Sequence, residues 1–598
     1  MLIRSVLIAA GLLTMLAMPV LADRTMTADI YLDRLHAMWL GEMLGNYAGR
    51  PKEGSGARGG FTYTVPWTTL VTTNPWSGDD DTVFEYMYDS VLNASAAPTP
   101  TNAEIKTAWE TYVPLPSFYI ANKQARWLMG YGFAPPETGS IHYNVYWYAI
   151  DSQITTEAIG AAALGMRQQA ADLVKTFGSV TNDGFAVHAA QFYAAMYAAA
   201  PLETSVETVV EKGLAVVPQT SRTYQAIQDV RAWYAADKLD DGVLDWRATQ
   251  AKVYDKYYSD DGGRYRGWVE SAINTAMTTL ALLYGQDEYG HGDFEKAVEI
   301  AVQAGFDCDC NPATVGGLIG LMEGMAGLPA VSSDNYYAET LTNITKNTSM
   351  LQIALDWQQA AERQILAAGG TIEGTGAART YHLPSSDDVT TPPEKTDPAG
   401  PKGLVAEVLA RGGTVTASAS IAKHDPTVDR DNLEQIIDGI TDVSYNGHLP
   451  YSTDNGDNAQ PAGGDWYQLN FDREVRFDSL IFCEGDTRIH INTDPRASEP
   501  YGGYFDTLIV EVGQSGVFTS ASNLVLSEAL DPYKFYQVIE LQFDPVIGDA
   551  IRIRGQAGGQ YEFTTILELE AYGVVPEPAT LGMVVGGLAS LLVRRRRG

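Results

Sequence analysis

The strongest constraint on the fold is a change of residue pattern near residue 384. Before it, apolar residues recur at helical spacing, so that Leu32, Leu35 and Trp39 fall on one face of a helix. Beyond it, apolar and polar residues alternate, as in Val415–Ser420, and this alternation predicts strands. A chain of 598 residues is also too long for a single hydrophobic core. We therefore expect a multidomain protein, with an all-α domain followed by a β-domain.

Turn and linker signals divide the chain further. Residues 27–380 are expected to form the all-α domain, with clear helices at 31–40, 186–200 and 350–368. Residues 384–402 are rich in Pro, Ser, Thr and Asp without an apolar period, which indicates a linker. Residues 404–573 are expected to form a β-sandwich. Its further predicted strands lie at 466–471, 507–512 and 550–554.

Charge, cysteine content and the N-terminus bound the function. The net charge of -34 argues against a nucleic-acid partner, which would need a basic surface. The three cysteines, Cys308, Cys310 and Cys483, are too few for a disulfide framework. Arg4, an apolar stretch and a small-residue cleavage site predict a secretory signal peptide over residues 1–22. The protein is therefore expected to be exported.

The C-terminal residues 575–598 form a second targeting pattern. A Pro-Glu-Pro sequence is followed by an apolar run at 581–593 and by four arginines at 594–597. The run is shorter than the about 17–25 residues that span a bilayer comfortably, so it would be a short transmembrane segment. This order of parts resembles the PEP-CTERM sorting signal of Gram-negative bacteria. The resemblance implies processing by an exosortase, transient membrane anchoring, and a final place at the cell surface or in the extracellular matrix.

Two aspartate clusters stand out in the predicted helical domain. Asp79, Asp80 and Asp81 follow a Ser-Gly turn, and Asp307 and Asp309 precede an Asn-Pro sequence. Both clusters precede helical patterns, where aspartates can cap free N–H groups. Carboxylates packed this closely repel one another unless protons or a cation neutralise them, and they are common ligands of hard divalent cations. Helix caps and a shared metal site are both compatible with the spacing.

The order of these segments resembles the ADP-ribosylglycohydrolase family. Leu40–Gly49, with a glycine every four residues, is followed by Glu53 and is similar to the opening helix of that family. Asp79–Thr82 is similar to its Thr-Asp-Asp-Thr motif. Asp307–Gly317 is similar to its Asp-x-Asp-Thr-Asn-x-Ala motif, which runs into a helix of small residues. The resemblance implies an all-α hydrolase domain that cleaves a glycosidic bond.

The resemblance also implies a two-metal site and its ligands. The cations would be Mg²⁺, with Mn²⁺ as an alternative, and Glu53 would be the general acid–base residue. The implied metal ligands are Asp79, Asp80, Asp81, Asp307, Asp309 and Cys310. Three residues depart from the family pattern, because Asp79 and Cys310 each replace a threonine and Asn46 replaces an aspartate. Sulfur suits softer cations than Mg²⁺, so metal preference or substrate could differ here.

The substrate is less constrained than the metal site. The resemblance implies an ADP-ribosylated partner, yet the sequence shows no clear basic cluster for a diphosphate. The loop at residues 54–60, which contains Arg58, could offer N–H groups and one guanidinium to an anion, or it could simply be flexible. For an exported protein, a glycan is a second candidate substrate. A non-catalytic surface protein that binds carbohydrate is a third reading.

The β-domain resembles the discoidin-like, galactose-binding jelly roll. Leu433–Gly439, Gly464–Leu469 and Leu567–Gly573 carry this resemblance. It implies that loops at one end of the sandwich bind sugars, often with a structural Ca²⁺. Asp438 and Asp442 could hold that ion, or they could only shape turns. Nothing in the sequence indicates an oligomeric state.

Overall fold

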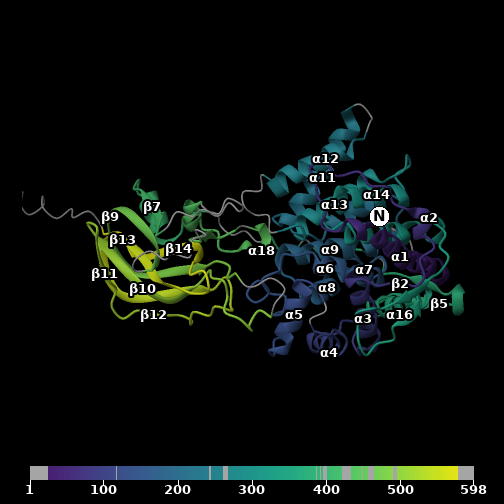
Figure 1. Ribbon diagram of the computed structural model, residues 1–598, viewed down its shortest axis with the longest axis horizontal. Helices are drawn as coiled ribbons and strands as arrows, with labels where there is room; N and C mark the ends of the chain where they lie inside the picture. The colour runs from purple at the N-terminus through teal and green to yellow at the C-terminus, as the bar shows by residue number, and fades with distance from the viewer. Residues whose placement is uncertain are drawn as a thin grey trace, which may run out of the picture.

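The computed structural model consists of a helical domain followed by a β-sandwich (Figure 1). The helical domain is drawn from purple to teal and the sandwich in green and yellow, which confirms the predicted fold class. The structure describes residues 24–115, 118–240, 244–259, 267–384, 387–390, 392–394, 400–420, 432–447, 449–454, 464–488 and 494–576. The predicted signal peptide lies outside these residues, as does the predicted sorting signal except Val575 and Pro576. Among the described residues, no helix is both long and apolar enough to cross a membrane.

The helical domain contains the predicted helices and many shorter ones. The three helices predicted at 31–40, 186–200 and 350–368 are confirmed as parts of α1, α9 and α16. Its helices are α1 (Ala28–Gly49), α2 (Trp67–Leu70), α3 (Asp80–Ala94), α4 (Asn102–Tyr112), α5 (Ala121–Gly130), α6 (Asp151–Ile154), α7 (Glu157–Ala162), α8 (Arg167–Gly178), α9 (Gly184–Ala199), α10 (Val206–Leu214), α11 (Arg222–Asp240), α12 (Trp246–Tyr254), α13 (Ser271–Tyr284), α14 (Phe294–Ala304), α15 (Cys310–Glu323) and α16 (Met350–Ala367).

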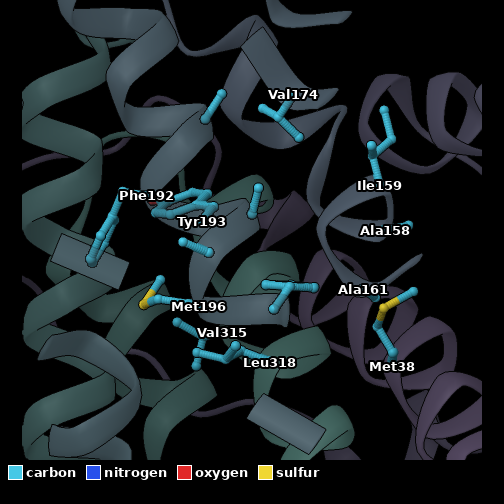
Figure 2. Packing of buried hydrophobic residues seen from close by; sticks show 14 of the residues in the cluster. Met38, Ala158, Ile159, Ala161, Val174, Phe192, Tyr193, Met196, Val315 and Leu318 are labelled. Atoms are coloured by element: carbon cyan, nitrogen blue, oxygen red, sulfur yellow. The ribbon is translucent and has the colours of Figure 1, made fainter. Parts of the chain in front are cut away.

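The core of this domain is built around α9. Alanine, phenylalanine, tyrosine and methionine fill this helix, and all its residues except Gln191 are buried. Figure 2 shows Met196 of α9 facing Val315 and Leu318 of α15. Burial of large side chains at this density stabilises each helix far more than its intrinsic propensity does. The helices that carry the site are therefore held by a dry core on their inner sides.

Two small sheets, which the sequence did not predict, hold the ends of site segments. One joins β1 (Thr25–Thr27), β6 (Thr380–His382) and β5 (Thr371–Glu373), and thereby fixes the start of α1. The other joins β2 (Trp76–Ser77), β3 (Asn335–Tyr337) and β4 (Asn347–Ser349). Because β2 ends at Ser77 and the N–H of Gly78 donates to the carbonyl of Tyr337 at 2.9 Å, this sheet positions the turn that leads into α3.

The β-domain is an antiparallel sandwich, as predicted. Its strand order is β11-β10-β13-β9-β14-β8, with β12 paired to β13 and β7 to β9. The four predicted strand segments fall in β7, β9, β10 and β13. The strands are β7 (Val415–Ala419), β8 (Tyr451–Ser452), β9 (Asp465–Glu484), β10 (Phe505–Gln514), β11 (Val517–Ser520), β12 (Val525–Leu526), β13 (Val538–Ala557) and β14 (Thr565–Val574), and the short helices are α17 (Gly403–Ala410) and α18 (Val443–Asn446).

The sandwich contacts the helical domain through two of its loops. The helix α18 packs on α9 so closely that a Cβ atom on Gly184 would lie 2.0 Å from the carbonyl oxygen of Ser444. The N–H of Phe535 donates to the carbonyl of His142 at 2.9 Å, and the Nδ1 atom of His142 lies 2.8 Å from the carbonyl oxygen of Phe535. These contacts join the two domains through backbone atoms and the side chain of His142.

The described part of the predicted linker lies against the helical domain. Arg167 donates to Asp387 through both its backbone N–H, at 3.0 Å, and its Nε atom, at 2.5 Å. The carboxylate of Glu394 accepts from the backbone N–H groups of Gln219 and Thr220 at 2.8 and 2.9 Å. Residues 387–394, where described, are therefore bound along the surface of α8 and the loop before α11.

Candidate metal centre in the helical domain

Close packing of α1 against α15 builds the floor of the site. A Cβ atom on Gly41 would lie 2.2 Å from the carbonyl oxygen of Gly316, and one on Gly45 would lie 2.0 Å from that of Pro312. At the end of α1, a Cβ atom on Gly49 would lie 1.6 Å from the carbonyl oxygen of Cys308. Only glycine permits backbones to approach this closely. The glycine spacing seen in the sequence therefore brings the end of α1 onto the loop at residues 307–309.

The first aspartate cluster begins α3. Asp79 is the N-cap, and its Oδ1 atom accepts the N–H of Asp80 at 3.0 Å. Asp81 is buried, and its Oδ1 atom accepts the N–H of Thr82 at 2.7 Å. The capping hypothesis is thus correct for Asp79. It does not account for Asp80 and Asp81, which lie inside the first turn.

The second cluster precedes α15. Asp307, Asp309 and Cys310 are all buried, and each offers a ligand atom within 4.8 Å of the other two. The backbone of Asp307 is anchored from α13, where Asn274 accepts its N–H at 3.1 Å. No described residue donates a hydrogen bond to the buried Oδ1 atom of Asp309. The three ligand atoms therefore face a common point with one oxygen free.

The two clusters lie close enough for their charges to interact. Burial raises the pKa of Asp80 well above its ordinary value, and Asp79, Asp81 and then Asp309 raise it further. Burial likewise raises the pKa of Asp307 to about 7, and the charge of Asp80 contributes to that increase. The charges of the two aspartate clusters therefore influence one another, and a single site shared by both clusters stays a prediction.

The residues fit divalent cations. Burial and the charge of Asp79 raise the pKa of Asp81 to about 8, so in the metal-free protein protons neutralise part of this cluster. A cation would replace those protons and would also satisfy the free Oδ1 atom of Asp309. The oxygen donors suit hard cations, whereas the sulfur of Cys310 suits softer ones. Asp307, Asp309 and Cys310 are the one group of three or more acidic, cysteine or histidine side chains among the described residues whose ligand atoms all lie within 4.8 Å of one another.

Glu53, the acid–base residue that the resemblance implies, interacts electrostatically with Asp79 and Asp309. It follows the short helix at Arg50–Lys52, and its side chain is exposed. Its pKa is raised by partial burial and by the charge of Asp79, whereas Arg50 lowers it. An exposed carboxyl with a raised pKa can exchange a proton with a bound molecule. Its role as the acid–base residue stays a prediction.

Two of the three departures from the family pattern share one network of polar contacts. Arg50 Nε lies 3.1 Å from Asp79 Oδ2, so the added negative charge of Asp79 has a counter-charge. The same Nε atom donates to Asn46 Oδ1 at 2.6 Å, and Asn46 Nδ2 donates to Asp81 Oδ2 at 3.2 Å. Asn46 therefore links Arg50 to Asp81, whereas Cys310 belongs to the opposite cluster.

Sequence reasoning missed three site residues. Asp151 at the start of α6 is buried, its Oδ2 atom accepts no hydrogen bond from a described residue, and its charge raises the pKa of Asp80. Asn274 holds Asp307 from α13. Arg50 pairs with Asp79. Asp151 and Asn274 belong to no sequence motif. Arg50 directly follows the Leu40–Gly49 segment that resembles the opening helix of the family, so its position was the one available signal.

The loop at residues 54–60 does not present its groups to an anion. Arg58 makes two hydrogen bonds of 2.6 Å to Asp255. The N–H of Gly54 donates to the carbonyl of Phe306 at 3.0 Å, and that of Gly59 donates to Gln250 at 2.5 Å. The guanidinium and these N–H groups are already engaged. Anion binding by this loop therefore stays a prediction, and Arg58 would have to leave Asp255 to take part in it.

In the β-sandwich, Asp438 and Asp442 both shape turns. Asp438 Oδ1 accepts the N–H of Ile440 at 2.8 Å, and Asp442 caps α18 by accepting the N–H of Ser444 at 2.8 Å. Asp438 also faces Glu568 of β14, whose pKa is raised to about 9 by burial and by the charge of Asp438. The structural Ca²⁺ in this domain stays a prediction.

Several solved structures resemble the chain. The family 32 CBM from Clostridium perfringens NanJ, in complex with galactose, is 19% identical, covers 26% of this chain and 92% of its own, and has a TM-score of 0.17. CpGH89CBM32-5 from the same organism, in complex with GalNAc-β-1,3-galactose, is 12% identical over 27% of this chain and 95% of its own, with a TM-score of 0.19. A structure of the Streptococcus pneumoniae β-galactosidase BgaA is 9% identical over 27% of this chain and 99% of its own, with a TM-score of 0.21.

The helical domain has a clear assignment. No curated protein matches the chain. The model of the family described as ADP-ribosylglycohydrolase matches residues 27–363, which is more than half of the 598 residues and includes both aspartate clusters and Glu53. The chain therefore belongs to the ADP-ribosylglycohydrolase family.

Proposed function

We propose that the helical domain is a metal-dependent hydrolase that cleaves an N- or O-glycosidic bond of an ADP-ribosyl or related sugar substrate. The observation that carries this proposal is the buried group of Asp307, Asp309 and Cys310, whose ligand atoms lie within 4.8 Å of one another and whose acids feel the charges of Asp80 and Glu53. Family membership agrees with hydrolysis. When bound, two divalent cations would supply orientation of a ribose-like diol and polarisation of the bond to be cleaved.

The side chains of the site would share the remaining work. Asp80, Asp307 and Asp309 would hold the cations. Asp81 would add a ligand from the first cluster, and Cys310 would add one from the second. Glu53 would take a proton from the attacking water and return it to the leaving group as the glycosidic bond breaks. Arg50 would keep Asp79 in place through their ion pair. Water supplies the new oxygen on the sugar, so no further reactant is needed.

The proposal can be tested with the purified protein. Release of free ADP-ribose and of reducing sugars would be measured with Mg²⁺, Mn²⁺ or a chelator. We expect turnover with metal and its loss in Asp80→Ala and Asp309→Ala. Asp172→Ala, on the exposed side of α8, is the matched control and should retain activity. Turnover that ignores chelator and both site substitutions would contradict the two-metal proposal.

A glycan is the second candidate ligand, and one surface of the sandwich favours it. The rings of Tyr501 and Tyr561 lie 5.1 Å apart, and Tyr561 is 38% exposed. Nearby, Arg488 lies 5.4 Å from the ring of Phe563 and 2.9 Å from Asp454. Exposed aromatic rings beside an anchored arginine can stack on a sugar and donate hydrogen bonds to it. We propose that this surface binds glycans and directs the hydrolase domain to them.

Binding of galactose-containing glycans to the purified protein would test this second role. Tyr561→Ala should weaken binding by about tenfold, since aromatic anchors commonly contribute more than 1 kcal/mol. Tyr289→Ala removes an exposed tyrosine of the helical domain and should have no effect. Sugar binding without turnover of either substrate class would favour a non-catalytic surface protein.

We also propose export to the cell surface, on the strength of the two terminal segments at 1–22 and 575–598. Protease treatment of intact cells should degrade the protein. Removal of residues 575–598 should release it from the cells. Protein that stays protected inside intact cells would contradict this localisation.

A further inference from the structure

Two cysteines separated by one residue differ in what their sulfur atoms contact. The Sγ atom of Cys310 lies within 4.8 Å of carboxylate oxygens from Asp307 and Asp309. The Sγ atom of Cys308 instead lies 3.4 Å from the carbonyl oxygens of Ser55 and Phe306. Both cysteines are buried. Only Cys310 therefore offers its sulfur to the metal centre.

A second observation is a buried carboxylate oxygen without a partner on the Cys310 side of the centre. Asp309 is only 4% exposed, and its buried Oδ1 atom accepts no hydrogen bond from any described residue. A buried carboxylate oxygen normally has a partner. The neighbouring polar side chains have other partners, because Asn311 donates to Asn274 at 2.8 Å and Thr314 donates to Glu157 at 2.7 Å. A cation at the point shared by Asp307, Asp309 and Cys310 would satisfy this free oxygen.

The surroundings of Cys310 favour a sulfur–metal bond. Cys310 is the first residue of α15, which places its sulfur beside carboxylate oxygens of Asp307 and Asp309. On its other side it packs with Ile150 and Ile154, which keep that face apolar. Mg²⁺ demands oxygen ligands in near-octahedral geometry, whereas Zn²⁺, Fe²⁺ and Co²⁺ accept mixed sulfur and oxygen ligands.

We propose that the centre is chemically asymmetric, with Cys310 as a sulfur ligand that selects a borderline-soft divalent cation of the Zn²⁺ or Fe²⁺ class on the side of Asp307 and Asp309. The side of Asp79, Asp80 and Asp81 offers oxygen atoms only and takes a hard cation such as Mg²⁺ or Mn²⁺. This inference rests on the proposed two-metal function, but it makes a separate statement about metal identity.

Cobalt provides a direct optical test. Co²⁺ would be titrated into the metal-free protein, and near-ultraviolet thiolate-to-cobalt charge-transfer absorption would be recorded. We expect the band in the native protein and in Cys308→Ser, and its loss in Cys310→Ser and Cys310→Thr. Circular dichroism would show that each variant is folded. Co²⁺ binding without the band in the native protein, or a band that persists in Cys310→Ser, would overturn the proposal.

Metal competition separates this proposal from the function on which it rests. With Zn²⁺ and Mg²⁺ supplied together, the native protein should retain one Zn²⁺, and Cys310→Thr should lower the Zn²⁺ affinity by at least about tenfold. An unchanged Zn²⁺-to-Mg²⁺ selectivity in Cys310→Thr would overturn the asymmetric centre, and metal-dependent turnover would still support the hydrolase. Failure of any divalent cation to bind, together with turnover that ignores chelator, would overturn both.

Discussion

Arg50 Nε lies 3.1 Å from the carboxylate of Asp79 and joins the end of α1 to the start of α3. Asp79 stands where the family pattern has a neutral threonine, so the ion pair offsets a charge that this chain adds to the site. The guanidinium also lies 4.2 Å from the ring of Tyr47. Asp79 and Arg50 thus form an ion pair, and the ring of Tyr47 supports the guanidinium.

Arg50→Gln should remove this ion pair without unfolding the domain. Both side chains are about one-third exposed, so we expect a loss of stability of only about 0.5–1 kcal/mol. The metal-free protein should show a larger effect at pH 8 than at pH 6, because Asp81, whose pKa is raised to about 8, is then more ionised and repels Asp79 more strongly. Thermal unfolding would measure it. In a double-mutant cycle, Asp79→Asn should remove most of the effect of Arg50→Gln, and additive effects would show that the pair is not coupled.

The aspartates of the first cluster should differ in importance. Asp79 already accepts the N–H of Asp80 and pairs with Arg50, whereas Asp80 is buried and feels the charge of Asp309 in the opposite cluster. Asp80→Asn should lower metal affinity and kcat by more than about 100-fold, beyond the usual effect of an outer-sphere partner. Asp79→Asn should cost about tenfold or less. Calorimetric metal titration and turnover assays would check this order, and equal losses would contradict it.

The glycine contacts between α1 and α15 should be intolerant of any side chain. Gly316→Ala would place a methyl group 2.2 Å from the carbonyl oxygen of Gly41, so the helices must separate. We expect a loss of about 1–3 kcal/mol in unfolding free energy and weaker metal binding, because the loop at 307–309 rests on α1. Gly130→Ala in α5 meets nothing within 4 Å and should be neutral or slightly stabilising. Similar unfolding curves for both variants would refute the close-packing argument.

The metal-free protein should lose stability as the pH rises. Folding raises the pKa of Asp307 to about 7 and that of Asp81 to about 8, both above their ordinary values. The folded protein therefore binds these protons more tightly than the unfolded chain does, and this stabilisation is lost as the pH rises through about 7–8. The melting temperature in chelator should be lower at pH 8.5 than at pH 6. Added metal should largely remove the difference, and a melting temperature that increases with pH in chelator would oppose this assignment.

The elements could be read from the sequence because their signals are local. Apolar spacing predicted α1, α9 and α16, and alternation predicted the strands that became β7, β9, β10 and β13. The short β1 to β6 escaped detection, since strands of two or three residues carry almost no periodicity. The ordered acidic motifs likewise pointed to one candidate site.

Which groups face one another was decided by long-range packing. The contact of Gly49 with Cys308 carries the second cluster to the first, and it brings Arg50 to Asp79 at the same time. Asp151 joins them from α6 although no motif surrounds it. The pairing of Arg58 with Asp255, which lies 197 residues away, likewise could not be predicted from the sequence. The residue pattern thus predicts the helices and strands and the types of side chain available for the site. Which of those side chains contact one another depends on the tertiary structure, because their distances are set by the packing of segments far apart in the chain.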